Sequence, residues 1–126
     1  MSDILKKTAE TLVANCKTGK AREGLDTLYA PDAVSVEAGP GPDGSDPVTK
    51  GVDGIRGKHD WWEANFEVHD VNIDGPFLHG SERFAVIFEL DTTHKESGQR
   101  SQMKEVAIYT TGADGKIVRE EFYYTM

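Results

Sequence analysis

Apolar residues recur at helical spacing near the start of the chain. Over residues 4–16 they return every three or four positions, which predicts a helix with one apolar face. Ser2 or Asp3 can cap the start of this helix, and Gly19 can end it in the left-handed conformation. A second, short helix is expected over residues 21–29, with its apolar side chains facing inward.

The next segment predicts a strand, a loop and a third helix. Residues 34–37 have the composition of a strand, and residues 39–50 hold three of the five prolines, which is typical of a loop. A helix is predicted over residues 52–65, because apolar and aromatic residues return there at helical spacing. The inward face of this helix is expected to hold Val52, Ile55, His59, Trp62 and Phe66.

Beyond the third helix the pattern has a period of two, which indicates strands. Strands are predicted over residues 67–73, 83–93, 102–111 and 116–124. Gly75 and Pro76 are expected to break the first of them. Early helices followed by strands joined as hairpins are typical of an α+β fold. The sequence therefore predicts a single domain over residues 1–126, with three N-terminal helices packed in a curved, mainly antiparallel sheet that leaves a cone-shaped interior.

The charge balance restricts the partners of this chain. Its 126 residues carry 14 Lys and Arg against 22 Asp and Glu, a net charge of −8, which does not suit nucleic acid or an anionic membrane. The single cysteine excludes an internal disulfide and a zinc site built on cysteines. The N-terminus does not resemble a secretory signal, and the longest apolar run, residues 84–88, is far too short to span a membrane. We therefore expect a cytoplasmic protein that binds neither nucleic acid nor membrane.

Motifs for cofactors are weak. None of the four histidines lies at the spacing that places two metal ligands on one helix face or strand. A literal G-x-G-x-x-G at Gly39, Gly41 and Gly44 is interrupted by prolines and precedes no helix, so it does not predict a dinucleotide site. We expect neither a metal ion nor an organic cofactor.

Three stretches carry a family resemblance. They are TLYAPDAVSVE at 27–37, GVDGIRG at 51–57, and EVAIY at 105–109 continued by DGKIVREEFYY at 114–124. In these residues and in their order, the sequence resembles the SnoaL-like group of the nuclear transport factor 2-like superfamily, which includes polyketide cyclases and ketosteroid isomerases. The resemblance implies a conical α+β barrel with a pocket at its open end, and in many members a homodimer formed through the outer face of the sheet.

The resemblance also implies roles for two carboxylates. Ketosteroid isomerases have a general base on the first strand, and the match puts Glu37 there. Their oxyanion hole uses a tyrosine on the first helix and a protonated aspartate on a later strand. Glu105 matches the aspartate, but Leu12 stands at the tyrosine position, so the resemblance does not extend to the usual steroid isomerisation.

Strand alternation gives a separate argument for an acidic interior. If Glu105 points inward, Ala107 and Tyr109 do so as well. The inward face of the last strand is expected to hold Val118, Glu120, Phe122 and Tyr124. Glu120 and Glu121 must face opposite ways, and a slip of one residue in the register would exchange them.

The candidate site has two sets of residues. The candidate catalytic residues are Glu37, Glu105 and Glu120. The candidate substrate-binding residues are His59, Trp62, His69, Phe88, Tyr109, Phe122 and Tyr124.

Each candidate has a simpler interpretation. Glu37 is equally compatible with a solvated strand end, and Glu105 with a lysine partner across the sheet. His59 and Trp62 lie on a helix stripe that is more often core than ligand contact. His69 is expected to share a strand face with Val71 and Ile73, near the pocket or at a dimer interface.

Carboxylates in an apolar interior favour proton transfer. Burial raises the pKa of a carboxyl group, and a like charge nearby raises it further. A neutral carboxyl group can donate a hydrogen bond to a developing enolate, whereas an ionised one can abstract a proton. The expected ligand is small and apolar or carbonyl-bearing. Two classes of function remain: a cofactor-free cyclase, isomerase or hydrolase, or a non-catalytic small-molecule-binding or dimerisation module.

Overall fold

The computed structural model describes residues 2–40, 44 and 46–124, and the side chain of the expected cap Ser2 lies outside the described residues. The helices are α1 (Ser2–Lys17), α2 (Leu25–Leu28) and α3 (Val52–Asn65). The strands are β1 (Tyr29–Val36), β2 (Val48–Lys50), β3 (Phe66–His79), β4 (Arg83–His94), β5 (Arg100–Thr111) and β6 (Ile117–Tyr123). This order of helices and strands confirms the predicted α+β fold.

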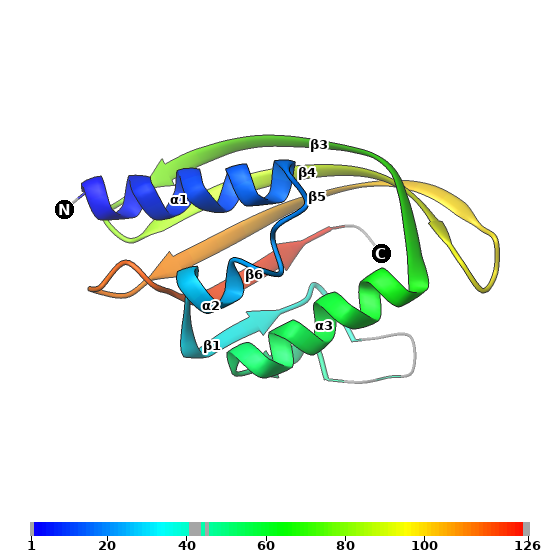
Figure 1. Ribbon diagram of the computed structural model, residues 1–126, viewed down its shortest axis with the longest axis horizontal. Coiled ribbons are helices and arrows are strands. Elements are labelled where there is room, and N and C mark those ends of the chain that lie inside the picture. The colour runs from blue at the N-terminus through cyan, green and yellow to red at the C-terminus, as the bar shows by residue number, and fades with distance from the viewer. Residues whose placement is uncertain (1, 41–43, 45, 125–126) are drawn as a thin grey trace.

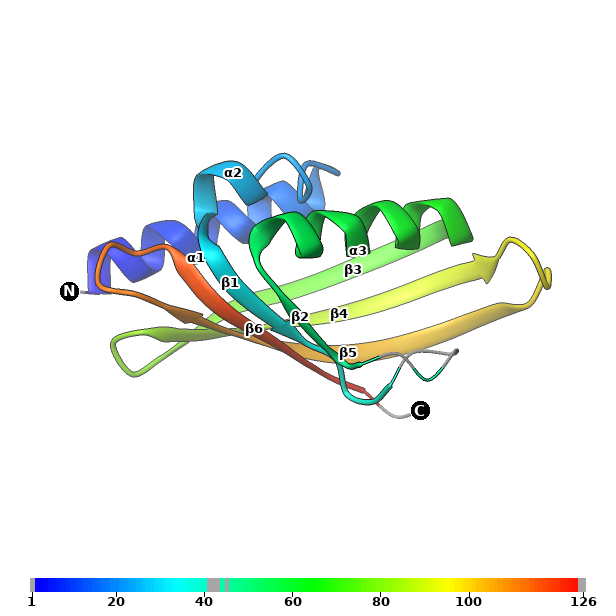
Figure 2. The same cartoon turned by 90° about the horizontal axis from the view of Figure 1, so that it is seen from below.

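The strands form one six-stranded sheet in the order β2-β1-β6-β5-β4-β3. All neighbours are antiparallel except β1 and β6, which run parallel. The sheet is strongly curved, and the three helices lie on its concave side (Figures 1 and 2). No helix of the described residues lies on its convex side (Figure 2), so the sheet has an inner face against the helices and an outer face that none of these residues covers with a helix.

The core lies between α1, α3 and the inner face of the sheet. Most of the apolar stripe of α1 is buried as predicted, including Leu5, Ala9 and Leu12, whereas Ile4 at its start is exposed; α3 contributes Ile55. Alternate residues of β4 and β5 face these helices, among them Phe84, Val86, Ala107 and Tyr109. Gly19 follows α1 with a φ of 73°, which confirms that it ends the helix in the left-handed conformation.

Two expectations for the early part of the chain are wrong. The second helix covers only Leu25–Leu28, because the chain turns into β1 from Tyr29, earlier than the predicted start at residue 34. Residues 48–50 were expected in a loop but form β2, since they pair antiparallel with Val34–Val36 at the edge of the sheet. Residues 41–43 and 45 of this stretch lie outside the described residues.

The sheet has several register shifts that differ from the simple alternation of the sequence, and two of them concern Gly75 and the last strand. β3 continues through Gly75 and Pro76 to His79, with the register shifting between Asp74 and Phe77 instead of the strand ending. A second shift lies between Thr110 and Thr111, and it buries Ile117 rather than Val118. No helix in the described part of the chain is long and apolar enough to cross a membrane.

Candidate functional site

One row of side chains crosses the inner face of the sheet at the site. Phe88 on β4 lies opposite Glu105 on β5, and Ile73 on β3 lies opposite Phe88. Val106 pairs with Tyr123, so Tyr124 follows opposite Glu105 on its other side. The register confirms that Glu105, Ala107 and Tyr109 share the inner face. It makes Phe88 and Tyr124 the cross-strand neighbours of Glu105 on this face.

Glu105 differs from the other two glutamates of this face in its lack of polar partners among the described residues. Its side chain is half-buried, and no hydrogen bond or ion pair reaches its carboxyl group from the residues that the structure describes. Burial, followed by the negative charge of Glu37, raises its pKa to about 7, while Lys58 acts in the opposite direction. The alternative of a lysine partner across the sheet is wrong, because the cross-strand neighbours of Glu105 are Phe88 and Tyr124. A carboxyl group with this pKa exchanges protons near neutral pH.

Glu37 lies beside Glu105 but has firm partners. Lys58 on α3 donates a hydrogen bond to it (Nζ–Oε2 2.6 Å), and the hydroxyl of Tyr124 donates to its other oxygen at 2.9 Å. Burial and this hydrogen bond raise the pKa of Tyr124 to about 12, so the phenol remains a donor. Glu37 is consequently an ion-paired carboxylate rather than a solvated residue at a strand end.

Glu120 lies deepest of the three glutamates. It is 3% exposed, and it accepts hydrogen bonds from Tyr29 on one oxygen and from Ser35 on the other (Oγ–Oε2 2.7 Å). Burial raises its pKa, whereas these two hydrogen bonds lower it. Glu121 is on the opposite face, opposite Ile108. The register therefore decides that Glu120 is the inner residue of the pair, and its filled hydrogen bonds indicate a positioning role.

Lys58 is the residue that the sequence analysis missed. It donates to Ser35 (Nζ–Oγ 2.7 Å) as well as to Glu37. The hydroxyl of Ser35 donates a hydrogen bond to Glu120, so one hydroxyl group connects the ammonium group to the buried carboxylate. The helical spacing held a signal, because position 58 is three residues after Ile55 and four before Trp62, on the same inward face.

The aromatic candidates divide into two groups. Phe122 lies under the ammonium group of Lys58, with Nζ 5.4 Å from the ring centre. It belongs to the group of side chains around Glu37, Glu105 and Glu120, which we call the glutamate cluster. Phe88 and Tyr124 flank Glu105. Tyr109 is buried and stacked on Phe84, with ring centres 4.8 Å apart. It is therefore part of the hydrophobic core and not an exposed side chain that a ligand could contact.

The two candidates on α3 lie toward the edge of this cluster. Trp62 stacks on Phe66, with ring centres 5.4 Å apart, at the junction of α3 and β3. His59 is half-buried, and burial lowers its pKa, with Glu63 opposing this effect. Neither side chain makes a hydrogen bond to a glutamate of the site within the described residues.

His69 is not where the alternation placed it. A bulge between Val68 and Asp70 shifts the register of β3, so that Val71 lies opposite Leu90 on the inner face. The ring of His69 instead contacts Thr93 (Nε2–Oγ1 2.6 Å) on the outer side of the sheet. The prediction that His69 shares a face with Val71 and Ile73 is therefore wrong. One extra residue at the bulge exchanges the two faces of the sheet for the side chains that follow it.

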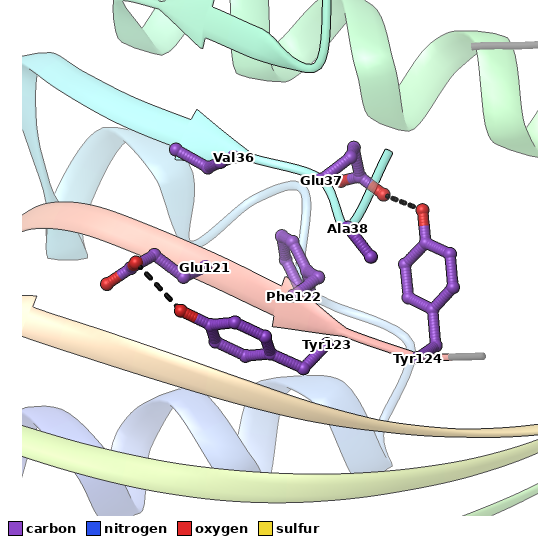
Figure 3. A pocket seen from close by; sticks show the side chains of 7 residues that line it. All are labelled: Val36, Glu37, Ala38, Glu121, Phe122, Tyr123 and Tyr124. Atoms are coloured by element: carbon purple, nitrogen blue, oxygen red, sulfur yellow. Dashed lines mark hydrogen bonds between the residues drawn. The ribbon is translucent and has the colours of Figure 1, made fainter. Parts of the chain in front are cut away.

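A pocket of about 300 Å³ opens where β1 and β6 end, beside Glu37 (Figure 3). Its lining residues are Val36, Glu37, Ala38, Glu121, Phe122, Tyr123 and Tyr124. Figure 3 shows Glu37 and Tyr124 joined on one side of the strands and Glu121 and Tyr123 joined on the other. The pocket thus touches the glutamate cluster at Glu37 without including Glu105.

The inner face also offers apolar surface beyond the core. Val68 is 43% exposed and Val71 40% exposed, although both lie on the concave side, and Leu90 is half-buried between them and β5. The β4–β5 hairpin extends past the helices on this side (Figure 1). Within the described residues no three His, Cys, Asp or Glu side chains form a metal cluster. The arrangement combines one proton-exchanging carboxyl group, one ammonium group and an apolar surface.

The family assignment rests on the sequence match. A model of the SnoaL-like domain matches residues 5–124 of the chain. The chain belongs to the SnoaL-like family. This SnoaL-like protein is 36% identical to a SnoaL-like protein from Mesorhizobium loti whose given name proposes polyketide cyclase activity. That likeness covers 94% of this chain and 97% of the other, with a TM-score of 0.85. No curated protein is similar enough to count as a match.

More distant solved structures share the fold of this SnoaL-like protein. One is the Δ5-3-ketosteroid isomerase of a Mycobacterium species, with 22% identity, a TM-score of 0.70, and coverage of 98% of this chain and 94% of that one. Another is a Mycobacterium tuberculosis protein in complex with estradiol-17β-hemisuccinate, with 19% identity, a TM-score of 0.69, and coverage of 99% and 94%. These likenesses confirm the predicted nuclear transport factor 2-like fold.

Proposed function

We propose that this SnoaL-like protein is a cofactor-free enzyme that transfers a proton next to a carbonyl group of a small, apolar ligand. The reaction class includes cyclisation and isomerisation, in which an enolate forms and is then consumed. The observation that supports this most is the carboxyl group of Glu105, which has Phe88 and Tyr124 as cross-strand neighbours and a pKa raised to about 7.

Glu105 suits proton transfer better than the other two glutamates. A general base works best when its pKa is close to the operating pH, because the ionised form is then both present and basic. Glu37 is held by Lys58 and Tyr124, and both oxygens of Glu120 accept hydrogen bonds. We therefore assign the proton transfer to Glu105. Glu37 and Glu120 hold Lys58 in position, Glu37 directly and Glu120 through Ser35.

The ligand class follows from the surface around Glu105. Exposed valines and the half-buried Phe88 and Leu90 lie on the concave face, and such surface binds flat, apolar molecules. The relatives agree with this choice, since one has a name that proposes polyketide cyclase activity and another binds a steroid derivative.

The test uses 2-tetralone, a flat neutral ketone with acidic α-protons. The protein is incubated with it in D2O, and loss of the α-proton signals is followed by NMR against buffer alone. We expect faster exchange with the wild type and a loss of that acceleration in Glu105→Gln, which keeps the shape of the side chain without its titration. Binding of 2-tetralone without accelerated exchange would contradict the enzymatic proposal.

That contrary outcome corresponds to a second candidate, a non-catalytic module that binds small molecules. It is favoured by the complete hydrogen bonding of Glu37 and Glu120, which is typical of a fixed binding wall. A computationally designed 17-OHP binder has the same fold, with 22% identity, a TM-score of 0.69, and coverage of 93% of this chain and 90% of that one. Under this candidate Glu105→Gln changes affinity only.

We further propose that the protein is a cytoplasmic homodimer that pairs through the outer face of the sheet. In the part of the chain that the structure describes, no helix lies on that face (Figure 2). Its centre is apolar, since Ile87 lies opposite Val106 and Val106 opposite Tyr123, which is 53% exposed. Exposed apolar surface is typical of an interface between subunits, and these three side chains supply it on this face.

A further inference from the structure

We propose that Lys58 is a catalytic residue of this site, and that its ammonium group donates a hydrogen bond to the carbonyl oxygen of the bound ketone. This assignment rests on the proposed proton transfer and names the group that stabilises the resulting enolate. It also specifies the ligand, because an ammonium group at this position selects an oxygen that gains negative charge.

The supply of hydrogen-bond donors favours Lys58 over the other polar groups. The phenols of Tyr29 and Tyr124 each have one proton, and each donates it to a glutamate. Ser35 donates its proton to Glu120. An ammonium group has three protons, and the described residues accept two of them, at Ser35 and Glu37. One N–H of Lys58 therefore remains for a ligand.

The position of Lys58 suits an oxyanion beside Glu105. Lys58 and Tyr124 bind the two oxygens of Glu37, and Tyr124 lies opposite Glu105 in the sheet. Phe122, beneath the ammonium group at 5.4 Å, belongs to the same inner face. The charge of Lys58 also acts on the Glu105 carboxyl group, whose pKa it lowers. A ligand that contacts Glu105 thus lies within the field of this cation.

The ammonium group is held in place before any ligand binds. Ser35 is fully buried and is fixed by Glu120, which Tyr29 holds from β1. Donors that are already oriented need little reorganisation as charge develops, which is why they stabilise a transition state. The first helix offers no such group at Leu12, which is 4% exposed and apolar.

The proton and electron changes balance without a cofactor. Ionised Glu105 takes the α-proton, so that a C–H bond breaks and an O–H bond forms on the carboxyl group. The electron pair of that C–H bond moves into the new C=C bond, and the pair of the C=O π bond moves onto the oxygen beside Lys58. The carboxyl proton of Glu105 then exchanges with solvent, and Glu105 delivers a solvent-derived proton to carbon, so that an O–H bond breaks, a new C–H bond forms and the enolate becomes a ketone again; in D2O this step places deuterium on the α-carbon.

The test compares Lys58→Met with Lys58→Arg, which keeps the charge, and with Lys7→Met, an exposed control on α1. In the 2-tetralone exchange assay we expect Lys58→Met to lose about 100-fold or more, as on removal of an oxyanion donor. We expect Lys58→Arg to restore part of the rate and Lys7→Met to match the wild type. Equal exchange by Lys58→Met and the wild type would overturn the assignment.

A second readout does not depend on turnover. 4-Nitrophenol resembles an enolate when ionised, and its absorption spectrum reports the ionised fraction when bound near neutral pH. We expect the wild type and Glu105→Gln to favour the bound phenolate and Lys58→Met to bind mainly the neutral phenol. If the phenolate is favoured but no 2-tetralone exchange occurs, the proposed reaction fails while Lys58 remains an oxyanion donor. If the wild type does not favour the phenolate, the assignment of Lys58 is wrong.

Discussion

Lys58 on α3 donates a hydrogen bond to the fully buried hydroxyl of Ser35 on β1, with Nζ and Oγ 2.7 Å apart. The hydroxyl in turn donates to Glu120, so its single proton fixes the direction of the whole chain of hydrogen bonds. A half-buried cation and a buried carboxylate are thereby linked through one small side chain. The link joins the third helix to the two parallel strands of the sheet.

Removal of this hydroxyl is expected to destabilise the fold. Ser35→Ala leaves one oxygen of Glu120 without a donor in a buried place, and an unsatisfied buried group costs about 1–3 kcal/mol, with more expected for a charged one. The loss is measured as a lower free energy of unfolding in urea. Ser101→Ala, on an exposed position of β5, is the control and is expected to stay within about 0.5 kcal/mol. Equal stability of the two variants would show that the link contributes nothing.

Glu105 is expected to make the protein less stable as the pH rises. Its pKa is about 7 in the folded chain against an ordinary value of 4.5, so between these values the folded state holds a proton that the unfolded state has released. The free energy of unfolding therefore falls through this range, by up to about 3 kcal/mol from this group. Below pH 4.5 and above pH 7 its contribution is constant.

Glu105→Gln tests this pH dependence directly. The variant cannot ionise, so we expect a flatter curve of unfolding free energy against pH and a higher stability than the wild type above pH 7. Urea unfolding at a series of pH values measures both. Glu10→Gln, on an exposed position of α1, should follow the wild-type curve. A wild-type curve that is already flat between pH 4.5 and 7 would contradict the raised pKa of Glu105.

The proposed dimer makes a separate prediction on the outer face. Ile108→Asp adds a charge to the apolar surface next to Val106, where burial in an interface would leave it unpaired. We expect the wild type to have the mass of a dimer in light scattering at micromolar concentration and the variant to have that of a monomer. Lys7→Met, on α1, should remain a dimer. A monomeric wild type would exclude pairing through this face.

The elements of the fold were largely predictable from local patterns. The apolar stripe of α1 and the alternation in β4 and β5 set which residues are buried, because helices and strands have fixed periods. The same alternation put Glu105 on one face with Ala107 and Tyr109, whereas its inward direction was an expectation from the family resemblance. β2 was not predictable, since three residues among prolines carry little pattern, and only their pairing with β1 makes them a strand.

The site was predictable in part. Glu37, Glu105 and Glu120 all reach the inner face, but their differences in partners do not appear in the sequence. His69 was assigned to the wrong face because a bulge in β3 has no clear local signature. One extra residue in a strand moves every later side chain to the other face of the sheet than simple alternation predicts. Lys58 was missed although it lies on the inward face of α3, because lysine at such a position usually extends to solvent.

The sequence by itself determined the order of the main helices and strands and which residues of each share a face, since each depends on neighbours a few residues away. Only the tertiary structure decided which glutamate is free, which is ion-paired and which is buried. Those properties depend on Lys58, Ser35, Tyr29 and Tyr124, which the fold brings together from a helix and separate parts of the sheet. Hydrogen bonds and charge effects act over a few ångströms in space, so contacts distant in sequence set the chemistry of the site.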